Sequence, residues 1–146
     1  HREEAYKKLT DYLGFDLISE SFNHFLASAE FEAVSDGKII SRGEFLYSPK
    51  LKEIIPRDRS AIRGTLKEWD RVAPEEIEAS ILRVVSNACG ILKHDIPKSC
   101  AKLLGYNQAS DSANLVINNK LNELIRSGIL SEERGYLVLR ENIVAH

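Results

Sequence analysis

The sequence predicts a mainly α-helical protein with small β-ribbons. In several stretches the apolar residues recur at intervals of three and four, which places them on one face of an α-helix. Glycines close these stretches, and two of them are followed by short apolar segments that flank polar residues, as in a β-hairpin. Hydrophobic residues make up 43% of the 146 residues and charged residues 29%, which suits a globular domain with a polar surface.

Three helices are expected in the second half of the chain. The first starts at Pro74, because proline is favoured in the first turn of a helix, and ends before Gly90. The second ends at Gly105, and the third starts after Ser110 and ends at Gly128. Their apolar stripes consist of Ile77, Ile81, Val84 and Val85, of Ile96, Cys100, Leu103 and Leu104, and of Ile117, Leu121, Leu124 and Ile125.

A short β-ribbon is expected after the third helix. Ile129 and Leu130 precede a polar tip at residues 131–135, and residues 136–139 are apolar again. Three helices followed by such a ribbon form the element order of a winged helix-turn-helix domain, for which we set the boundaries at residues 74–146. In that fold the third helix is the one that enters the major groove of DNA.

The first half of the chain repeats this pattern with an offset of 91 residues. Residues 2–13 form an amphipathic helical pattern before Gly14, as do the residues before Gly105. Gly37 and Gly128 then close the next helical pattern in each half, and a hairpin pattern follows both. An equivalence that needs no gap over this length predicts an internal duplication, and therefore a tandem winged helix-turn-helix.

The N-terminal copy, residues 1–48, lacks the first helix of this fold. That helix would lie before His1, and because the chain contains no methionine, we expect it to be part of a longer protein. The apolar surface on which the missing helix would pack must then be covered by another segment. Residues 49–73 join the two copies and are too apolar for a free linker, so we expect an ordered connector with a short helix around residues 61–69.

The connector is the one basic block of the chain. The whole chain has a net charge of −2 and a pI near 6.1, which argues against tight non-specific binding to nucleic acid. Residues 49–73, however, contain 7 basic and 4 acidic side chains. Arg57, Arg59 and Arg63 are therefore candidate phosphate contacts. The alternative is that Arg57-Asp58-Arg59 forms internal ion pairs that hold the connector to a neighbouring copy.

Polar side chains on the third helix provide a second set of candidates. Asn119, Asn122 and Arg126 lie opposite its apolar stripe, and Asn118 lies on the flank. Asparagine can pair with adenine through two hydrogen bonds, and arginine can bind guanine or phosphate. The alternative is a solvated polar face without a ligand, which Glu123 on the same side favours because a carboxylate repels phosphate.

No motif in the sequence provides catalytic chemistry. The phosphate loop GxxxxGK[ST] and the motifs HExxH, CxxC and GxSxG are absent, so we expect no catalytic residue, no bound metal, no cofactor and no small-molecule substrate. Cys89 and Cys100 are expected to be buried free thiols. No apolar run approaches the ~18 residues of a membrane span and no signal peptide is visible, so we expect a cytoplasmic location without membrane contact.

Several short motifs of the chain resemble one family. They are Ile55-Pro56-Arg57-Asp58-Arg59-Ser60, Ala73-Pro74-Glu75-Glu76-Ile77, Leu103-Leu104-Gly105-Tyr106 and Leu124-Ile125-Arg126-Ser127-Gly128-Ile129-Leu130. Together they resemble the C-terminal domain of unknown function of large bacterial superfamily I helicase-related proteins, over roughly residues 50–140. In such proteins an ATPase core, and often an endonuclease-like domain, lies upstream. The resemblance implies an accessory module of a DNA- or RNA-handling enzyme and brings no catalytic residues.

Two hypotheses for the function follow. The first is an accessory nucleic-acid-binding winged-helix module of a larger helicase- or nuclease-related protein, which is non-catalytic on its own and binds DNA or RNA weakly and in a salt-dependent way. The alternative is a protein–protein docking module with the same fold, which contacts other domains of the parent protein or a partner. The connector and the resemblance favour the first, whereas the acidic ribbon tip, the low pI and the outward position of Leu115 favour the second.

Overall fold

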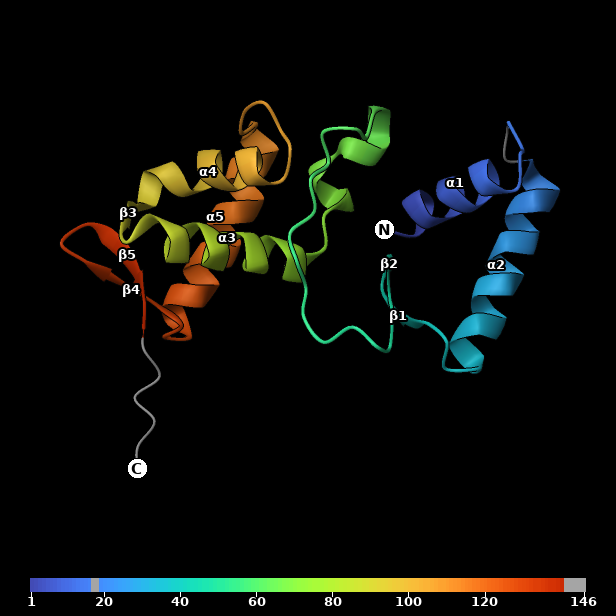
Figure 1. The fold of residues 1–146 in the computed structure, drawn as a ribbon, viewed down its shortest axis with the longest axis horizontal. Helices are drawn as coiled ribbons and strands as arrows, with labels where there is room; N and C mark the ends of the chain where they lie inside the picture. The colour runs from blue at the N-terminus through green and yellow to red at the C-terminus, as the bar shows by residue number, and fades with distance from the viewer. Residues whose placement is uncertain (17–18, 141–146) are drawn as a thin grey trace. The chain divides into compact units, whose positions relative to one another are not determined.

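The computed structural model describes residues 1–16 and 19–140 and shows a mainly α-helical chain with two small antiparallel sheets (Figure 1). The mainly α class with small β-ribbons is therefore confirmed. The chain divides into two compact units, His1–Glu53 and Ile54–His146, called unit 1 and unit 2 below. The C-terminal domain predicted at residues 74–146 extends into residues 141–146, which lie outside the described part of the chain.

Unit 1 consists of two helices followed by a β-hairpin. Its elements are α1 (Arg2–Tyr12), α2 (Glu20–Ser35), β1 (Ile40–Arg42) and β2 (Phe45–Tyr47). α2 starts where the Ser19 hydroxyl accepts a hydrogen bond from the amide of Phe22 at 3.2 Å, and it ends before Gly37, whose φ is +69°. Glycine adopts this left-handed conformation without strain, so Gly37 fixes the point at which the chain leaves the helix toward β1. The helix that the sequence predicts before Gly37 is confirmed.

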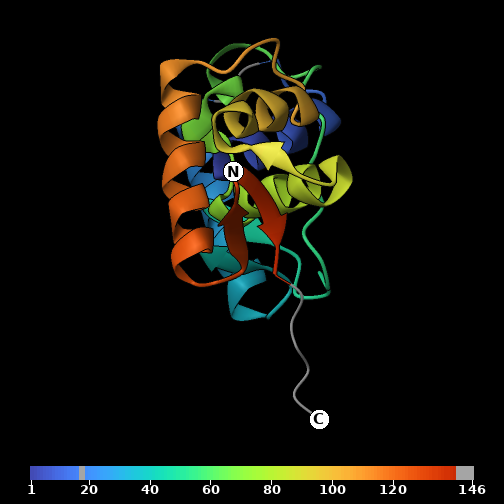
Figure 2. The same ribbon diagram turned by 90° about the vertical axis from the view of Figure 1, so that its left-hand side faces the viewer.

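Unit 2 consists of three main helices and a three-stranded sheet. Its elements are α3 (Pro74–Ala88), β3 (Ile91–Leu92), α4 (Ile96–Leu103), α5 (Asp111–Arg126), β4 (Leu130–Glu133) and β5 (Tyr136–Leu139), with short 3-10 turns η1 (Gly64–Lys67), η2 (Trp69–Arg71) and η3 (Lys93–Asp95). The strand order is β3-β5-β4, so the strand that follows α3 pairs with the second strand of the hairpin. Figure 2 looks onto this unit with α5 on the left and β4 and β5 in front.

One hydrophobic core joins the elements of unit 2. α3 packs against α4, α5 and β5, and α4 packs against α5. Ile77, Ile81 and Val85 of α3 point into this core because residues at i, i+4 and i+8 lie on one side of a helix. The other buried members are Trp69, Val72, Ile96, Cys100, Ala101, Leu104, Ala113, Ile117, Leu121, Leu124, Leu130 and Leu137. The core therefore fixes which side of α5 faces outward.

The connector is ordered, and residues 54–73 belong to unit 2. Where the sequence predicts one short helix at residues 61–69, the chain forms the two 3-10 turns η1 and η2. Trp69 of η2 is buried, and its ring stacks on that of Tyr106 with centroids 4.3 Å apart. Burial of this aromatic side chain makes the second half of the connector part of the folded unit.

The elements of the two units occur at positions 91 residues apart. α2 and α5 obey this offset at both ends, and the hairpins β1–β2 and β4–β5 follow it as well. The helix ends are also closed in the same way, because the amide of Lys38 donates to the carbonyl of Ala33 at 2.9 Å and the amide of Ile129 donates to that of Leu124 at 3.0 Å. α3 has no counterpart among the described residues of unit 1.

Candidate functional site

The outward side of α5 carries the polar residues that the sequence predicts as candidate contacts for nucleic acid. Ser112, Leu115, Asn119, Asn122 and Arg126 follow one another at intervals of three or four, so they form a single stripe away from the core. We call these five residues the α5 stripe. Asn119, Leu115 and Arg126 are exposed and Asn122 is half-buried. The stripe contains hydrogen-bonding groups and one cation but no carboxylate.

The asparagine side chains of α5 are not used to hold the fold together. In residues 1–16 and 19–140, no hydrogen bond is formed by the side chains of Asn118, Asn119 or Asn122. Asn118 is half-buried on the flank of the stripe. The helix is instead fixed at its start by Ser110, whose hydroxyl accepts a hydrogen bond from the amide of Ala113 at 3.2 Å. The amide groups of the three asparagines therefore remain available to a ligand.

Glu123 lies beside the stripe but is engaged by a cation. Its carboxylate accepts a hydrogen bond from Nζ of Lys120 at 2.6 Å, and this contact holds the pKa of Glu123 below its ordinary value, with a smaller contribution from the charge of Arg126. The repulsion of phosphate that the sequence leads one to expect from Glu123 is thus partly offset. Glu132 and Glu133 on β4 remain exposed and acidic.

Two of the three arginines predicted to contact phosphate are joined to Glu76 of α3. Arg59 is 1% exposed, and its Nη2 lies 2.6 Å from Oε2 of Glu76. Arg57 is more exposed, but its amide donates to Oε1 of Glu76 at 2.9 Å and its Nε lies 3.4 Å from the same oxygen. A phosphate contact by Arg59 is incompatible with this burial. The arrangement is the internal ion-pair motif that the sequence offers as the alternative for Arg57 and Arg59.

Arg63 remains on the surface. Its guanidinium donates to the main-chain carbonyls of Ser60 and Ile62, the latter at 3.3 Å, and its side chain makes no contact with Glu76 that would bury it. Lys67 lies nearby in the sequence, with its Nζ 5.4 Å from the centre of the Tyr106 ring, a cation–π contact. Arg63 therefore stays a candidate for a phosphate contact.

A hollow of about 520 Å³ lies where the connector meets the start of α5. Trp69 and Tyr106 provide aromatic surface, Lys67 provides a positive charge, and Glu68 and Asp70 provide two carboxylates. Ser110 and Ser112 also line the hollow, and their hydroxyl oxygens are 2.9 Å apart. Because Ser112 also belongs to the α5 stripe, the hollow and the stripe form one continuous surface of unit 2.

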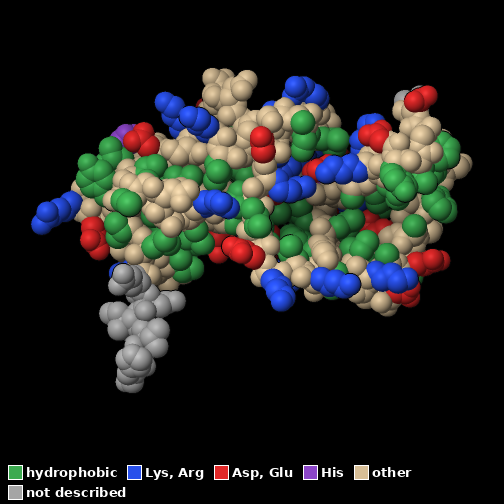
Figure 3. Space-filling model, viewed as in Figure 1, with side chains coloured by type: hydrophobic (Ala, Val, Ile, Leu, Met, Phe, Trp, Pro, Cys, Tyr) green, Lys and Arg blue, Asp and Glu red, His purple; other side chains and the backbone are tan. Residues whose placement is uncertain are grey.

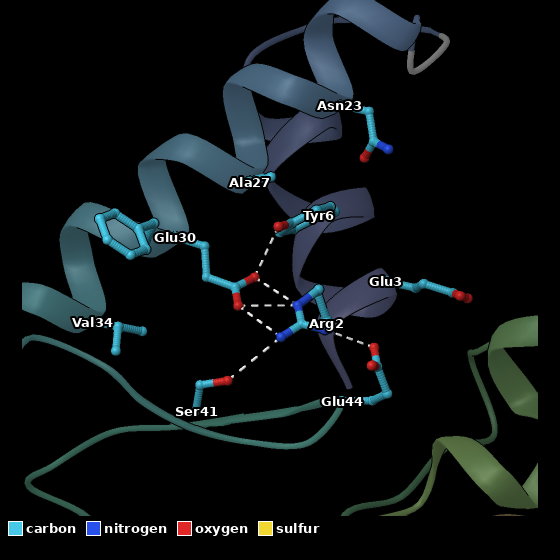
Figure 4. Close-up of a pocket in the computed structure, with 10 residues that line it drawn as sticks. Arg2, Glu3, Tyr6, Asn23, Ala27, Glu30, Val34, Ser41 and Glu44 are labelled. Atoms are coloured by element: carbon cyan, nitrogen blue, oxygen red, sulfur yellow. Dashed lines mark hydrogen bonds and ion pairs between the residues drawn. The ribbon is translucent and has the colours of Figure 1, made fainter.

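Unit 1 contains a second hollow, of about 640 Å³, with Arg2 at its centre (Figure 4). The guanidinium of Arg2 donates two hydrogen bonds of 2.8 Å to the carboxylate of Glu30. It also donates to the carboxylate of Glu44 at 2.7 Å and to the hydroxyl of Ser41 at 3.4 Å. The Tyr6 hydroxyl donates to Glu30 at 2.8 Å. These contacts join α1, α2 and the hairpin, and no sequence signal identifies them, because the partners are 24 to 42 residues apart.

Arg2 and Glu30 form a matched pair of charges in this hollow. The hydrogen bonds from Arg2 hold the pKa of Glu30 below its ordinary value, and Glu30 in turn raises the pKa of Arg2. Burial, together with the hydrogen bond to Glu30, raises the pKa of Tyr6 to about 12. Glu30 is therefore ionised and Tyr6 is neutral at pH 7, and both are committed to the network. Such a network stabilises the contact between the helices.

An apolar surface of unit 1 is open to solvent. Leu9, Leu13, Phe15 and Phe25 are all exposed large hydrophobic residues, and we call these four residues the open face. Figure 3 shows hydrophobic side chains reaching the surface over the end of α1 and the start of α2. Contiguous exposed apolar groups in a folded protein commonly mark a binding surface.

The two cysteines differ in exposure. Cys100 is buried in the core and burial raises the pKa of its thiol to about 11, whereas Cys89 is exposed. The expectation that Cys89 is buried is wrong: it is exposed at the C-cap of α3, where it has a left-handed conformation with φ +49°. Within the described ranges, no group of three or more His, Cys, Asp and Glu side chains is placed to hold a metal ion. None of the described helices combines the length and apolarity needed to cross a membrane.

Comparison of the chain with protein-family models, with curated proteins and with solved structures gives no match in any of the three. The functional assignment therefore depends on the residues of this chain and on the surfaces they form.

Proposed function

We propose that this chain is a non-catalytic accessory module of winged-helix type, belonging to a larger helicase-related protein that acts on DNA or RNA in the cytoplasm. In this proposal unit 2 binds nucleic acid through the α5 stripe, and unit 1 is a second copy of the fold without its first helix. The order of elements in unit 2, with β3 paired to β5 beside β4, supports a winged helix. The resemblance of residues 50–140 to the C-terminal domain of helicase-related proteins supports the wider context.

The observation that carries the nucleic-acid proposal is the α5 stripe. Asn119, Asn122 and Arg126 lie on the outward side of the third helix, the helix that reads the major groove in helix-turn-helix proteins. An asparagine amide can form two hydrogen bonds with adenine, and a guanidinium can bind guanine or phosphate. Lys67 at the neighbouring hollow adds one positive charge near the start of the same helix, beside the carboxylates of Glu68 and Asp70.

The binding should be weak. Arg59 is buried on Glu76, and Arg57 shares that carboxylate, so the connector supplies fewer free cations than its composition indicates. We expect contact with about two to four phosphates, and an affinity that falls as salt releases those contacts. The exposed Glu132 and Glu133 limit the affinity further.

The test is fluorescence anisotropy with labelled duplex, forked and single-stranded oligonucleotides at about 50 mM and about 200 mM salt, a range over which phosphate contacts weaken. Arg126→Ala should reduce binding to all sequences, whereas Arg83→Ala, which removes an exposed arginine from α3, should not. Asn119→Ala and Asn122→Ala should reduce discrimination between bases by about 1–3 kcal/mol per lost bidentate contact. No binding to any oligonucleotide at the lower salt concentration would refute the proposal for unit 2.

A second candidate function is protein docking by unit 1. The observation that favours it is the open face, which exposes Leu9, Leu13, Phe15 and Phe25 together. An apolar surface of this kind does not attract phosphate. Its exposure to water is unfavourable, so a partner that covers it lowers the free energy. In this reading the two units have different ligands, nucleic acid for unit 2 and a protein segment for unit 1.

A further inference from the structure

Leu9 of α1 and Leu13, which caps the end of that helix, are exposed at positions that are buried in unit 2. Leu9 and Leu13 are 40% and 47% exposed, whereas Cys100 and Leu104, the residues 91 positions later, are both 0% exposed. The backbone is the same at the two places, because the amide of Leu13 donates to Leu9 at 3.0 Å and that of Leu104 donates to Cys100 at 2.9 Å. The difference therefore lies in what covers the helix and not in the helix itself.

In unit 2, one cover is α3. This helix packs directly on α4, and its branched side chains Ile77, Ile81 and Val85 belong to the same buried core as Cys100 and Leu104. The three branched residues are spaced at i, i+4 and i+8, so a single amphipathic helix buries the whole face. Unit 1 has the face without such a helix among its described residues.

The second cover is an extended segment, residues 56–60, which we call the strap. The amide of Arg59 donates to the carbonyl of Leu104 at 2.9 Å. The strap passes so close to the turn after α4 that a Cβ added to Gly105 would lie 2.5 Å from the amide nitrogen of Ser60. In unit 1 no described residue lies within 4 Å of the same position at Gly14.

Among the described residues, none donates a hydrogen bond to the main-chain carbonyl of Leu13 at the end of α1. The equivalent carbonyl in unit 2, that of Leu104, accepts a hydrogen bond from the strap. A main-chain acceptor beside an apolar face favours a ligand with an extended backbone, because such a backbone supplies the N–H donor.

The third contact that covers this part of unit 2 is aromatic. In unit 2, Trp69 stacks on Tyr106, and the equivalent of Tyr106 in unit 1 is Phe15. Phe15 lies 4.7 Å from Phe22 between ring centroids, and Phe22 lies 5.9 Å from Phe25. Phe15 and Phe25 are exposed, so this cluster presents an aromatic surface where unit 2 holds a tryptophan.

We infer that the open face of unit 1 binds a partner segment built like residues 56–88 of this chain. The segment has an extended stretch that donates to the Leu13 carbonyl, an aromatic side chain for the Phe15 cluster, and an amphipathic helix with branched aliphatic residues at i, i+4 and i+8 for Leu9 and Leu13. This inference rests on the docking candidate and is independent of nucleic-acid binding by unit 2. A second copy of the chain is a poorer occupant, because its α3 and strap are already engaged in its own core.

The first experiment uses a fluorescein-labelled peptide of residues 54–90 as the probe and the full chain as the binder, with anisotropy as the measurement. The peptide should bind, and Leu9→Glu combined with Leu13→Glu should weaken binding by at least about tenfold, which corresponds to about 1.4 kcal/mol. Leu51→Glu is the matched control, because Leu51 is 50% exposed in the same unit and lies outside the open face. It should leave the affinity unchanged, and equal affinities for all three proteins would overturn the inference.

Folding of the variants is checked by circular dichroism, and both leucines are already partly exposed, so charged residues are tolerable there. A peptide carrying Ile77→Glu and Ile81→Glu provides a test that leaves the protein unaltered, and it should bind at least about tenfold more weakly than the original peptide. Equal binding of the two peptides would overturn the proposed helix contact. Oligonucleotide binding by the Leu9→Glu, Leu13→Glu protein should be unchanged, which separates failure of this inference from failure of nucleic-acid binding.

The location of the peptide is measured by replacing its Trp69 with a photo-reactive benzophenone residue and mapping cross-links by mass spectrometry. Cross-links should fall within residues 9–25 of unit 1. Cross-links confined to residues 100–117 would show exchange of the peptide with α3 in unit 2 and would overturn the inference. Sedimentation of the full chain tests the other occupant, because a dimer that Leu9→Glu and Leu13→Glu dissociate would show that a second copy covers the face.

Discussion

At the scale of single residues, Glu76 determines how the connector is held. Arg59 and Arg57 both reach its carboxylate, and Arg59 is almost completely buried. Taking an arginine and a glutamate out of water is costly unless each meets a partner, so neither side chain can be removed alone without leaving a buried charge. The pair therefore fastens the strap to α3.

Arg59→Ala should destabilise unit 2 by about 3 kcal/mol or more, because breaking a buried ion pair leaves the remaining charge uncompensated. Arg63→Ala, at an exposed position in the same segment, should change the free energy of unfolding by less than about 0.5 kcal/mol. Urea denaturation followed by the fluorescence of the single tryptophan, Trp69, measures both. Equal midpoints for the two variants would contradict the structural role of Arg59.

The Arg2–Glu30 pair gives a pH-dependent prediction. Because Arg2 holds the pKa of Glu30 below its ordinary value of 4.5, the pair stabilises the folded state at pH values above that value, and the contribution is lost as the pH falls through the lowered pKa. A carbon-13 NMR titration of the Glu30 carboxyl should therefore show a midpoint below 4.5. Arg2→Ala should move the midpoint upward, and an unchanged midpoint would argue against the pair.

The types of residue in the sequence suggest possible partners for the charged side chains, but they do not decide which partner each side chain has. The sequence Arg57-Asp58-Arg59 is compatible with phosphate contacts and with internal ion pairs, and only the position of Glu76 on α3 decides for Arg59. Asn119, Asn122 and Arg126 were predictable as an outward set, because helical spacing relative to Ile117 fixes their side. The network around Arg2 could not be predicted, since no local rule pairs residues so far apart in sequence.

At the scale of elements, helix boundaries follow closely from caps and glycines. Ser110, Gly37 and Gly128 bound α5 and α2 as the sequence indicates, and Ser19 caps the start of α2 in the same way as Ser110 caps α5. The connector was harder to predict because its apolar residues lack a sustained helical period, and its two 3-10 turns are set by packing of Trp69. Local chemistry thus determines the long helices, whereas tertiary contacts determine the short turns.

The reactivity of the two cysteine thiols measures how well α3 shields α4 from solvent. Cys89 is exposed at the end of α3, whereas Cys100 lies in the core with a pKa raised to about 11 by burial. A thiol reagent such as DTNB should therefore modify Cys89 quickly in the native protein and Cys100 only after unfolding. Cys89→Ser should abolish the fast phase, and fast modification of Cys100 in that variant would show that α3 does not protect α4.

At the scale of the whole molecule, the two units differ in how much core they have. The core of unit 2 contains fifteen buried hydrophobic residues, whereas Leu26 is the one buried hydrophobic residue among the described residues of unit 1. Burial of apolar area is the main stabilising term in folding, so unit 1 should open more readily than unit 2. Leu9 and Leu13 of the open face are exposed where the equivalent residues of unit 2 are buried, so unit 1 lacks buried apolar area at this face.

Hydrogen exchange measured by mass spectrometry should show this difference. The amides of α2 should exchange faster than those of α5, although the two helices have the same length and the same type of cap. Saturating amounts of the residue 54–90 peptide should slow exchange in α1 and α2 and leave α5 unchanged. Equal protection of the two helices without peptide would contradict the expected difference in stability.

Gly14 and Gly105 occupy equivalent positions, 91 residues apart, but they should differ in the substitutions that they tolerate. Both have positive φ, +78° and +80°, which asparagine also adopts at modest cost. Gly105 has a second constraint, because the strap leaves no room for a side chain, whereas no described residue lies within 4 Å of a Cβ at Gly14. Asparagine should therefore be accepted at position 14 of the free chain and rejected at position 105. If a strap-like partner occupies unit 1 in living cells, selection would remove that freedom, and related sequences would keep glycine at both positions.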